Sequence, residues 1–326
     1  MVAQCEIGAK SSGSRILAVI VFLVVVMTTA CATTTAPTQQ HLFAFHDNFW
    51  LNLHLFTRLV ARGESAPGNL SPEERATWDA AVRSYAPYTK RDLLFDDGMV
   101  AIQRELARCE KSESLDCATI DPELKATLLR IAPIYWKYWW PKHHASNEKF
   151  ISDVEPLIAR YGPELSRRVA AAYGQQWPPD PIPVDVTITA GANAAYTLAN
   201  PTYTTIASNE PTYAGFAALE ILFHESSHRW GSSLLNGVAR VARAHQKKLP
   251  PQLWHAVLFH TAGELTRRVL KENGIDYVEY AKKNDVYSQL CGAGCLDRVA
   301  AAWDPHLDGT RTFDEALEAL IASWPD

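Results

Sequence analysis

The chain of 326 residues has no excess of basic side chains: 31 lysines and arginines stand against 36 aspartates and glutamates, for a formal net charge of −5. Nucleic-acid-binding domains usually carry a basic face that neutralises phosphates, so this composition argues against nucleic acid as a partner. The chain is 47% hydrophobic and only 21% charged. These values exclude extensive intrinsic disorder and are typical of a folded globular protein.

Long apolar runs are also missing. The longest is Ile16–Met27, with 12 residues, whereas a membrane-spanning helix needs about 20. Lys10 and Arg15 precede this run, and small residues follow it, which is the pattern of an export signal. We therefore predict that residues 1–31 are a signal peptide and that the mature protein has no integral membrane domain.

The end of this segment resembles a bacterial lipoprotein processing site. Ala30 directly precedes Cys31, which would be the lipidated residue, and a Thr/Pro/Gln-rich tether follows. Lipoprotein sites usually carry Leu or Val where this chain has Thr28, and ordinary signal cleavage after Ala32 is the alternative. We expect an exported protein of the cell envelope, lipid-anchored or free in the periplasm, with secretion left open. The membrane would be contacted only through the lipid anchor, and the sequence does not indicate an oligomeric state.

Export changes how the remaining cysteines are interpreted. Cys109, Cys117, Cys291 and Cys295 are an even number in a compartment that permits disulfides. The simplest pairing joins 109 to 117 and 291 to 295. A zinc site made of these four is the competing interpretation, but neither pair has the two-residue gap typical of zinc knuckles.

Helical periodicity dominates the mature chain up to residue 176. We predict a tether over 32–45 and a helical lobe over 46–176, with Pro133 kinking one helix. The helices are expected at 47–61, 71–85, 92–109, 124–140, 153–160 and 163–173. The proline-rich segment Trp177–Pro183 excludes regular structure and marks a domain boundary.

The second lobe, 177–326, begins with alternating β-branched residues. These predict strands at 184–190 and 203–207, and helices follow at 211–235, 250–271 and 313–323. The predicted fold class is therefore α+β, predominantly α-helical, with a small sheet. We expect the two lobes to pack as one unit.

An HExxH motif, His224-Glu225-Ser226-Ser227-His228, lies in the predicted helix over 211–235. Histidines four residues apart lie on one helix face, so both imidazoles can bind one Zn²⁺. Glu225 lies about 100° around the helix axis, where it can accept a proton from zinc-bound water. The motif predicts a zinc-dependent metallohydrolase in which activated water attacks an amide carbonyl.

Zinc in a hydrolytic site needs a third protein ligand, and Glu264 lies in the next predicted helix. With this glutamate, residues 184–290 resemble the gluzincins, the thermolysin-like metallopeptidases in which a glutamate on a later helix completes the HExxH site. The resemblance implies a zincin-like lobe over 177–326, with His224, His228 and Glu264 as zinc ligands and a peptide or protein as substrate.

Other side chains could support or replace this set. Several gluzincins have an aspartate four residues after the ligating glutamate, which orients a zinc histidine, whereas this chain has Arg268. Glu220, one turn before the first histidine, could accept the far ring N–H of that histidine or be a solvated helix residue. His260 and Asp304 are the alternatives as third ligand.

The resemblance also implies a donor to the developing oxyanion and an edge strand for the substrate. Tyr277, Tyr280, Tyr287 and His306 follow the third ligand at suitable distances, and we select Tyr280. An extended peptide would pair with the strand at 184–190 or at 203–207. Asn193 and Tyr196 would then approach the substrate.

The second interpretation is a non-catalytic envelope lipoprotein that binds peptide or glycan through its aromatic-rich helical lobe. The segment Ile134–His144 is dense in Trp, Tyr and His, although a bulky helix in the core explains it equally well. A di-iron carboxylate bundle would need a second Glu-x-x-His motif, which the sequence does not contain.

Overall fold

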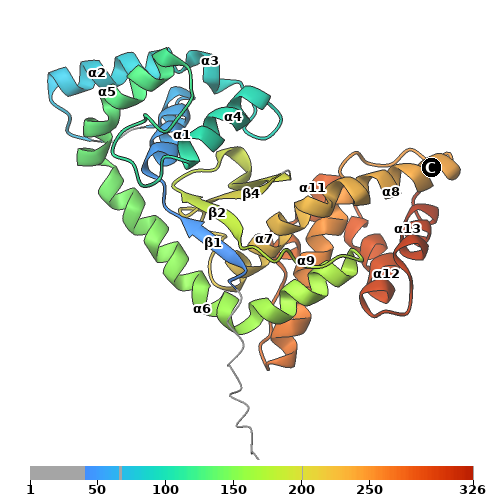
Figure 1. Ribbon diagram of the computed structural model, residues 1–326. Helices are drawn as coiled ribbons and strands as arrows, with labels where there is room; N and C mark the ends of the chain where they lie inside the picture. The colour runs from blue at the N-terminus through green and yellow to red at the C-terminus, as the bar shows by residue number, and fades with distance from the viewer. Residues whose placement is uncertain (1–40, 66–67, 200, 326) are drawn as a thin grey trace, which may run out of the picture. The chain divides into compact units, whose positions relative to one another are not determined.

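The computed structural model describes residues 41–65, 68–199 and 201–325 (Figure 1). The predicted signal peptide, Cys31 and most of the tether lie outside these residues. These described residues form one compact unit. Within the described part of the chain, no helix is both long and apolar enough to cross a bilayer.

The N-terminal part is helical, as predicted. Its elements are α1 (Phe49–Ala61), α2 (Pro72–Ser84), α3 (Ala86–Thr89), α4 (Asp97–Ala107), α5 (Pro122–Tyr138) and the long α6 (Trp140–Ala172). Side-chain caps fix several starts: Ser71 and Glu74 form a capping box at α2, and Asn48, Asp96 and Asp121 accept backbone N–H groups at α1, α4 and α5.

The C-terminal part contains the remaining helices. They are α7 (Phe216–Ser227), α8 (Gly231–Ala244), α9 (Leu253–Glu272), α10 (Tyr280–Lys283), α11 (Val286–Cys291), α12 (Cys295–Leu307) and α13 (Phe313–Ala322). Two short 3₁₀ turns, η1 (Gly191–Asn193) and η2 (His228–Trp230), complete the set. The predicted fold class, a predominantly helical α+β protein, is confirmed.

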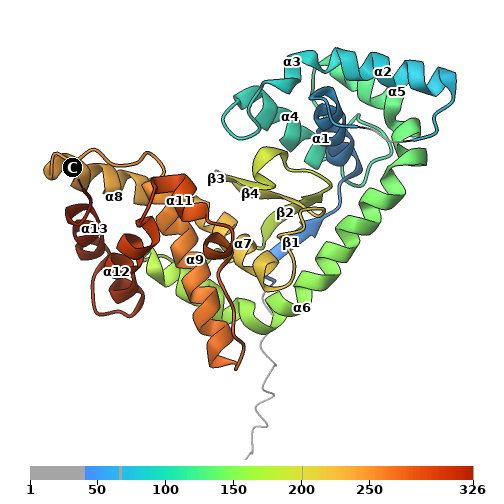
Figure 2. The same ribbon diagram turned by 180° about the vertical axis from the view of Figure 1, so that it is seen from behind.

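A mixed sheet lies between the two groups of helices (Figures 1 and 2). Its strands are β1 (Phe43–His46), β2 (Ile182–Thr187), β3 (Ala195–Ala199) and β4 (Thr202–Ala207), in the order β1-β2-β4-β3. β1 and β4 both pair with β2 in parallel, and β3 pairs with β4 antiparallel. The strand β1 overlaps the end of the predicted tether, so part of the stretch expected as tether belongs to the sheet.

Two hydrophobic cores flank this sheet. The N-terminal core is built from α1, α2, α4 and α5, with residues such as Leu51, Trp78, Met99, Leu128 and Trp139. The C-terminal core includes Val184, Leu222, Val257, Trp303 and Leu320. The second half of α6, from Phe150, packs in the C-terminal core, so the boundary between the cores lies within α6 rather than at the proline-rich segment.

Helix α6 differs from the two helices predicted at 153–160 and 163–173. It is continuous over 33 residues although Pro156 and Pro163 lie inside it, and Figure 1 shows that it bends along its length. Proline removes one helical hydrogen bond and favours a kink rather than a strict end. The prolines therefore bend one helix where the sequence suggested a break.

Both predicted disulfides are present. Cys109 pairs with Cys117 beside the N-terminal core, and Cys291 pairs with Cys295 between α11 and α12. The cysteines are therefore not available as a zinc site.

Candidate metal centre

The HExxH residues lie at the end of α7 and in the turn that follows. Ser226 and Ser227, the two central residues of the motif, donate their hydroxyls to the carbonyls of Leu222 and Phe223, four residues earlier. Such bonds compete with the helical pattern, and α7 passes into η2 at His228. The helix predicted over 211–235 is thus two helices, α7 and α8, joined by a short 3₁₀ turn.

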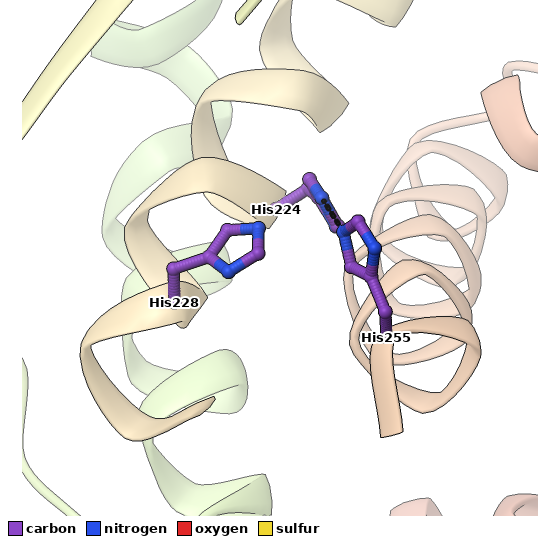
Figure 3. A group of neighbouring side chains, drawn as sticks. All are labelled: His224, His228 and His255. Carbon is purple, nitrogen blue, oxygen red and sulfur yellow. Dashed lines mark hydrogen bonds between the residues drawn. The ribbon is translucent and has the colours of Figure 1, made fainter. Parts of the chain in front are cut away.

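His255, in the first turn of α9, completes a group with the two motif histidines (Figure 3). One ligand atom from each of the three side chains lies within 4.8 Å of the others. The ring centroids form a nearly equilateral triangle, with separations of 5.0, 5.1 and 5.0 Å. Figure 3 shows the third imidazole reaching in from a separate helix.

The spacing suits a single metal ion. The Nε2 atoms of His224 and His255 are 3.2 Å apart. Two nitrogens bound to one tetrahedral zinc at 2.0–2.1 Å lie about 3.3 Å apart, so these two side chains can share an ion with little movement. Three protein ligands and one open position form the arrangement found in catalytic zinc sites.

Burial keeps these imidazoles neutral. Desolvation lowers the pKa of His228 to about 3 and that of His255 to about 4, and it lowers the pKa of His224 well below its usual value. A neutral imidazole offers a lone pair, which is the form that binds metals. His224 is fully enclosed, whereas His228 and His255 keep partial exposure, which leaves one side of the group accessible.

Aromatic rings fix the orientation of the group. Phe259, one turn after His255 on α9, stacks on His224 with ring centroids 3.7 Å apart. Trp254 stacks on His255 at 5.2 Å and meets His228 edge-on at 5.9 Å. This apolar surrounding lowers the local dielectric and limits the rotamers available to the imidazoles.

Glu225 points to the edge strand β3. It is 5% exposed, and its Oε2 accepts a hydrogen bond of 2.8 Å from the hydroxyl of Thr197, which lies 2.9 Å from the hydroxyl of Thr204 on β4. Burial raises the pKa of Glu225 to about 7, against the lowering effect of the Thr197 hydrogen bond. The sequence did not single out Thr197.

The structure does not bring Glu264 to the histidines. It follows His255 by nine residues on the same helix, which corresponds to about 13 Å along the axis and to the opposite face. Its carboxylate binds Arg267 at 2.6 and 2.7 Å and Arg268 at 2.7 Å. Although burial alone would raise it, these hydrogen bonds hold the pKa of Glu264 below its usual value. The prediction of Glu264 as third ligand therefore disagrees with the structure, in which His255 is the side chain that joins the two motif histidines.

The other candidates for this role also have different partners. His260 binds Asp304 at 2.7 Å, so these two residues satisfy each other. Glu220 accepts the hydroxyl of Tyr277 at 2.7 Å and the backbone N–H of Tyr280 at 2.9 Å. It therefore holds the segment after α9 and does not orient a zinc histidine.

Tyr280 lies near the group, separated from it by one ring. Its ring is 6.4 Å from that of Phe259, which covers His224, and 5.4 Å from that of Tyr213. The hydroxyl of Tyr213 donates to the carbonyl of Asn193 at 3.1 Å. A tyrosine hydroxyl on the accessible side of the histidine group could donate a hydrogen bond to an oxyanion. This role of Tyr280 stays a prediction.

Neither stretch that we expected to pair with an extended peptide lies at a sheet edge. The stretches at 184–190 and 203–207 contain β2 and β4, which are both interior strands, and the edge strand beside α7 is β3. Tyr196 on β3 points away from Glu225, because successive side chains alternate between faces, and its hydroxyl binds Gln103 in the N-terminal core. Asn193 lies in η1 at the surface.

The aromatic segment of the helical lobe is mostly core. Tyr135, Trp139 and Trp140 are buried, and the hydroxyl of Tyr135 bonds to His143 at 2.8 Å. Trp136, at 60%, and His144 are exposed. These contacts favour a packing role over a ligand-binding one.

A second group of possible ligands, Asp47, His144 and Glu148, lies within 4.8 Å at the surface. The carboxylate of Asp47 already binds His144 and the amide of Asn147. The three-histidine group is more buried than this one and lies beside the buried Glu225, so we treat it as the candidate centre.

Comparison of the chain with protein-family models, with curated proteins and with solved structures finds no match.

Proposed function

We propose that this protein is a zinc-dependent metallohydrolase, with His224, His228 and His255 as the metal ligands and Glu225 as the general base. The observation that carries the proposal is the convergence of three neutral imidazoles from two helices beside a buried carboxylate. Two imidazoles from one helix face could be satisfied by ordinary hydrogen bonds, whereas here a third, from α9, brings its Nε2 to 3.2 Å from that of His224.

The ligand set fits zinc. Three imidazoles at this separation suit a borderline-soft ion with tetrahedral preference. When bound, zinc would supply a Lewis acid that polarises a carbonyl and makes water more acidic.

The residues around the centre have separable tasks. Thr197 holds Oε2 of Glu225 by its hydroxyl, which leaves Oε1 of the same carboxylate to accept a proton from the attacking water and pass it to the leaving group. Phe259 and Trp254 exclude water from one side of the imidazoles. A tyrosine, for which we propose Tyr280, would stabilise the oxyanion.

A peptide is the proposed substrate class. β3 is the sheet edge nearest to Glu225 and carries Thr197, and an extended peptide can add to such an edge through its main chain. A scissile amide would then lie beside the carboxylate. The third ligand departs from the gluzincin pattern, so the proposal retains the HExxH chemistry of that group without its ligand set.

We also propose that the protein is exported to the cell envelope, lipid-anchored at Cys31 or free in the periplasm. The apolar run with basic residues before it supports export, and two disulfides suit an oxidising compartment. The non-catalytic alternative, binding through the aromatic lobe, has less support because most of those rings are buried.

The test compares Glu225→Gln with Glu264→Gln. We expect Glu225→Gln to retain one zinc per chain and to lose at least about 100-fold in peptide hydrolysis, because general-base catalysis contributes roughly 10²–10⁴-fold. Glu264→Gln, a matched change on α9, should keep both zinc and activity. Wild-type protein that holds no stoichiometric zinc after mild dialysis would refute the proposal.

A further inference from the structure

A cavity lies away from the metal centre, beside the N-terminal core. It has a volume of about 680 Å³, is open to solvent, and is lined by the end of α1, the segment between α3 and α4, and the η1 turn. This volume is in the range of small-molecule sites.

The charge of this cavity is opposite to that of the whole chain. Four of its lining side chains are cationic, Arg58, Arg62, Lys90 and Arg91, against one carboxylate, Asp92. The chain as a whole carries a formal charge of −5. Such local excess in a concave site concentrates anions.

Arg58 is the buried member of this set. It is 5% exposed, and its guanidinium donates Nε to the carbonyl of Tyr88 at 3.0 Å and Nη2 to that of Arg91 at 2.7 Å. Within the described residues it has no carboxylate at ion-pair distance. Burial and the neighbouring Arg62 lower the pKa of Arg58. A buried cation without an anion is costly, and this one retains Nη1 for a further acceptor.

The remaining cations differ in whether a carboxylate already pairs with them. Asp96 binds Arg91 through both oxygens, at 2.9 and 2.5 Å, and also caps α4, so Arg91 is neutralised and held in place. Arg62 and Lys90 are exposed at the rim and have no ion pair within the described part of the chain. Phe95, 82% exposed, lines the same cavity.

We propose that this cavity is a binding site for an oxyanion, a phosphate or carboxylate group carried by a small organic ligand, with Arg58, Arg62 and Lys90 as its cationic partners. Arginine matches both groups through its planar fork of donors. The volume exceeds that of a bare ion, and the exposed ring of Phe95 offers a surface for the organic part.

The site is separate from the metal centre. Tyr196 lines the cavity and Thr197, the next residue on β3, bonds to Glu225. Adjacent residues of a strand face opposite sides, so an anion bound here does not reach the histidines. The proposal therefore stands or fails independently of the proposed hydrolysis.

The test is calorimetric titration of the mature chain with inorganic phosphate and, separately, with citrate, at ionic strength held constant with chloride. We expect saturable binding of at least one anion, and the tighter of the two identifies the group preferred. The double variant Arg62→Gln/Lys90→Gln should weaken that binding at least about tenfold, because charge-assisted contacts are lost. Arg58 is left intact because it ties two loop carbonyls.

The matched control is Arg243→Gln/Lys248→Gln, which removes the same charges from the exposed end of α8 and the loop beyond. It should bind the anion within about twofold of wild type, since distant surface charges contribute little. Both double variants retain the histidines, so any anion bound at the metal is common to them. Equal affinity in the two variants, or no saturable binding by wild type, overturns the proposal.

Discussion

Replacing His255 is the sharpest test of the metal centre. Apparent zinc affinities of structural sites with four ligands correspond to about 10–16 kcal/mol, or roughly 2.5–4 kcal/mol per ligand. Removing one of three imidazoles should therefore weaken zinc binding by about 100- to 1,000-fold. We expect this loss for both His255→Ala and His255→Phe. The phenylalanine keeps a ring between Trp254 and Phe259, so it separates ligation from packing.

The assay is competition for zinc against a chromophoric chelator, with metal content determined on the dialysed protein. Zinc at 100 times its dissociation constant stabilises the fold by about 2.7 kcal/mol, or roughly 5 °C in Tm for a domain of this size. The His255 variants should lack this shift at the same zinc concentration. Circular dichroism checks that they remain folded.

Glu264→Ala and His260→Ala are the matched controls, because both residues lie on α9 and have partners of their own. They should change zinc affinity by less than about threefold, since distant sites are nearly additive. If Glu264→Ala loses zinc while the two His255 variants retain it, the ion is not held where the three imidazoles meet. The proposed assignment of His255 as a metal ligand is then wrong.

Three further predictions concern single contacts. Thr197→Val should lower kcat about tenfold at unchanged zinc content, because the Thr197 hydroxyl positions Glu225. Thr197→Ser, which keeps the hydroxyl, should recover kcat. An unchanged kcat in Thr197→Val would show that Thr197 does not position the general base. Burial raises the pKa of Glu220 to about 8. The contribution of its protonated form to the free energy of unfolding is therefore fully present below about pH 4.5. That contribution falls by at most about 1.4 kcal/mol per pH unit as the pH rises toward 8. Urea titrations at pH 5 and 8 should show a steeper fall in wild type than in Glu220→Gln, which keeps the contribution of the buried Glu225. Cys109→Ala/Cys117→Ala should cost about 2–3 kcal/mol in the same assay, and no change would show that the bridge adds nothing to stability.

The sequence predicted the helices best where local chemistry determines their ends. The capping box at α2 and the cap of α5 lie within a few residues of the predicted helix starts. The prediction failed where tertiary packing decides. The helix predicted over 211–235 was expected to end before Asn236 and Gly237, yet α8 runs through both. A Cβ on Gly237 would lie 2.7 Å from Leu317. That glycine is needed for close packing against α13.

The strands show the same limit. β3 has the sequence Ala-Tyr-Thr-Leu-Ala, and alanine has low β propensity, so no local signal identified it. β1 is four residues long and pairs with a strand more than 130 residues later. Because strand pairing is non-local, the edge beside Glu225 could not be identified from alternation alone, and two interior strands were selected instead.

The third ligand shows which part of a site the sequence leaves undetermined. Two ligands follow from the spacing of the histidines on one helix, but the third depends on which face of α9 meets α7. Helix α9 is buried on nearly all sides, and its enclosed residues include Ala256, Val257, Ala262 and Leu265. Its periodicity therefore does not select a face. One local signal was present: Glu264 is followed by arginines at i+3 and i+4, which satisfy a carboxylate within the helix. His255 has no such hydrogen-bonding partner within α9, and its Nε2 instead meets that of His224 on α7 at 3.2 Å. A largely buried imidazole that faces another imidazole is the stronger candidate for a ligand.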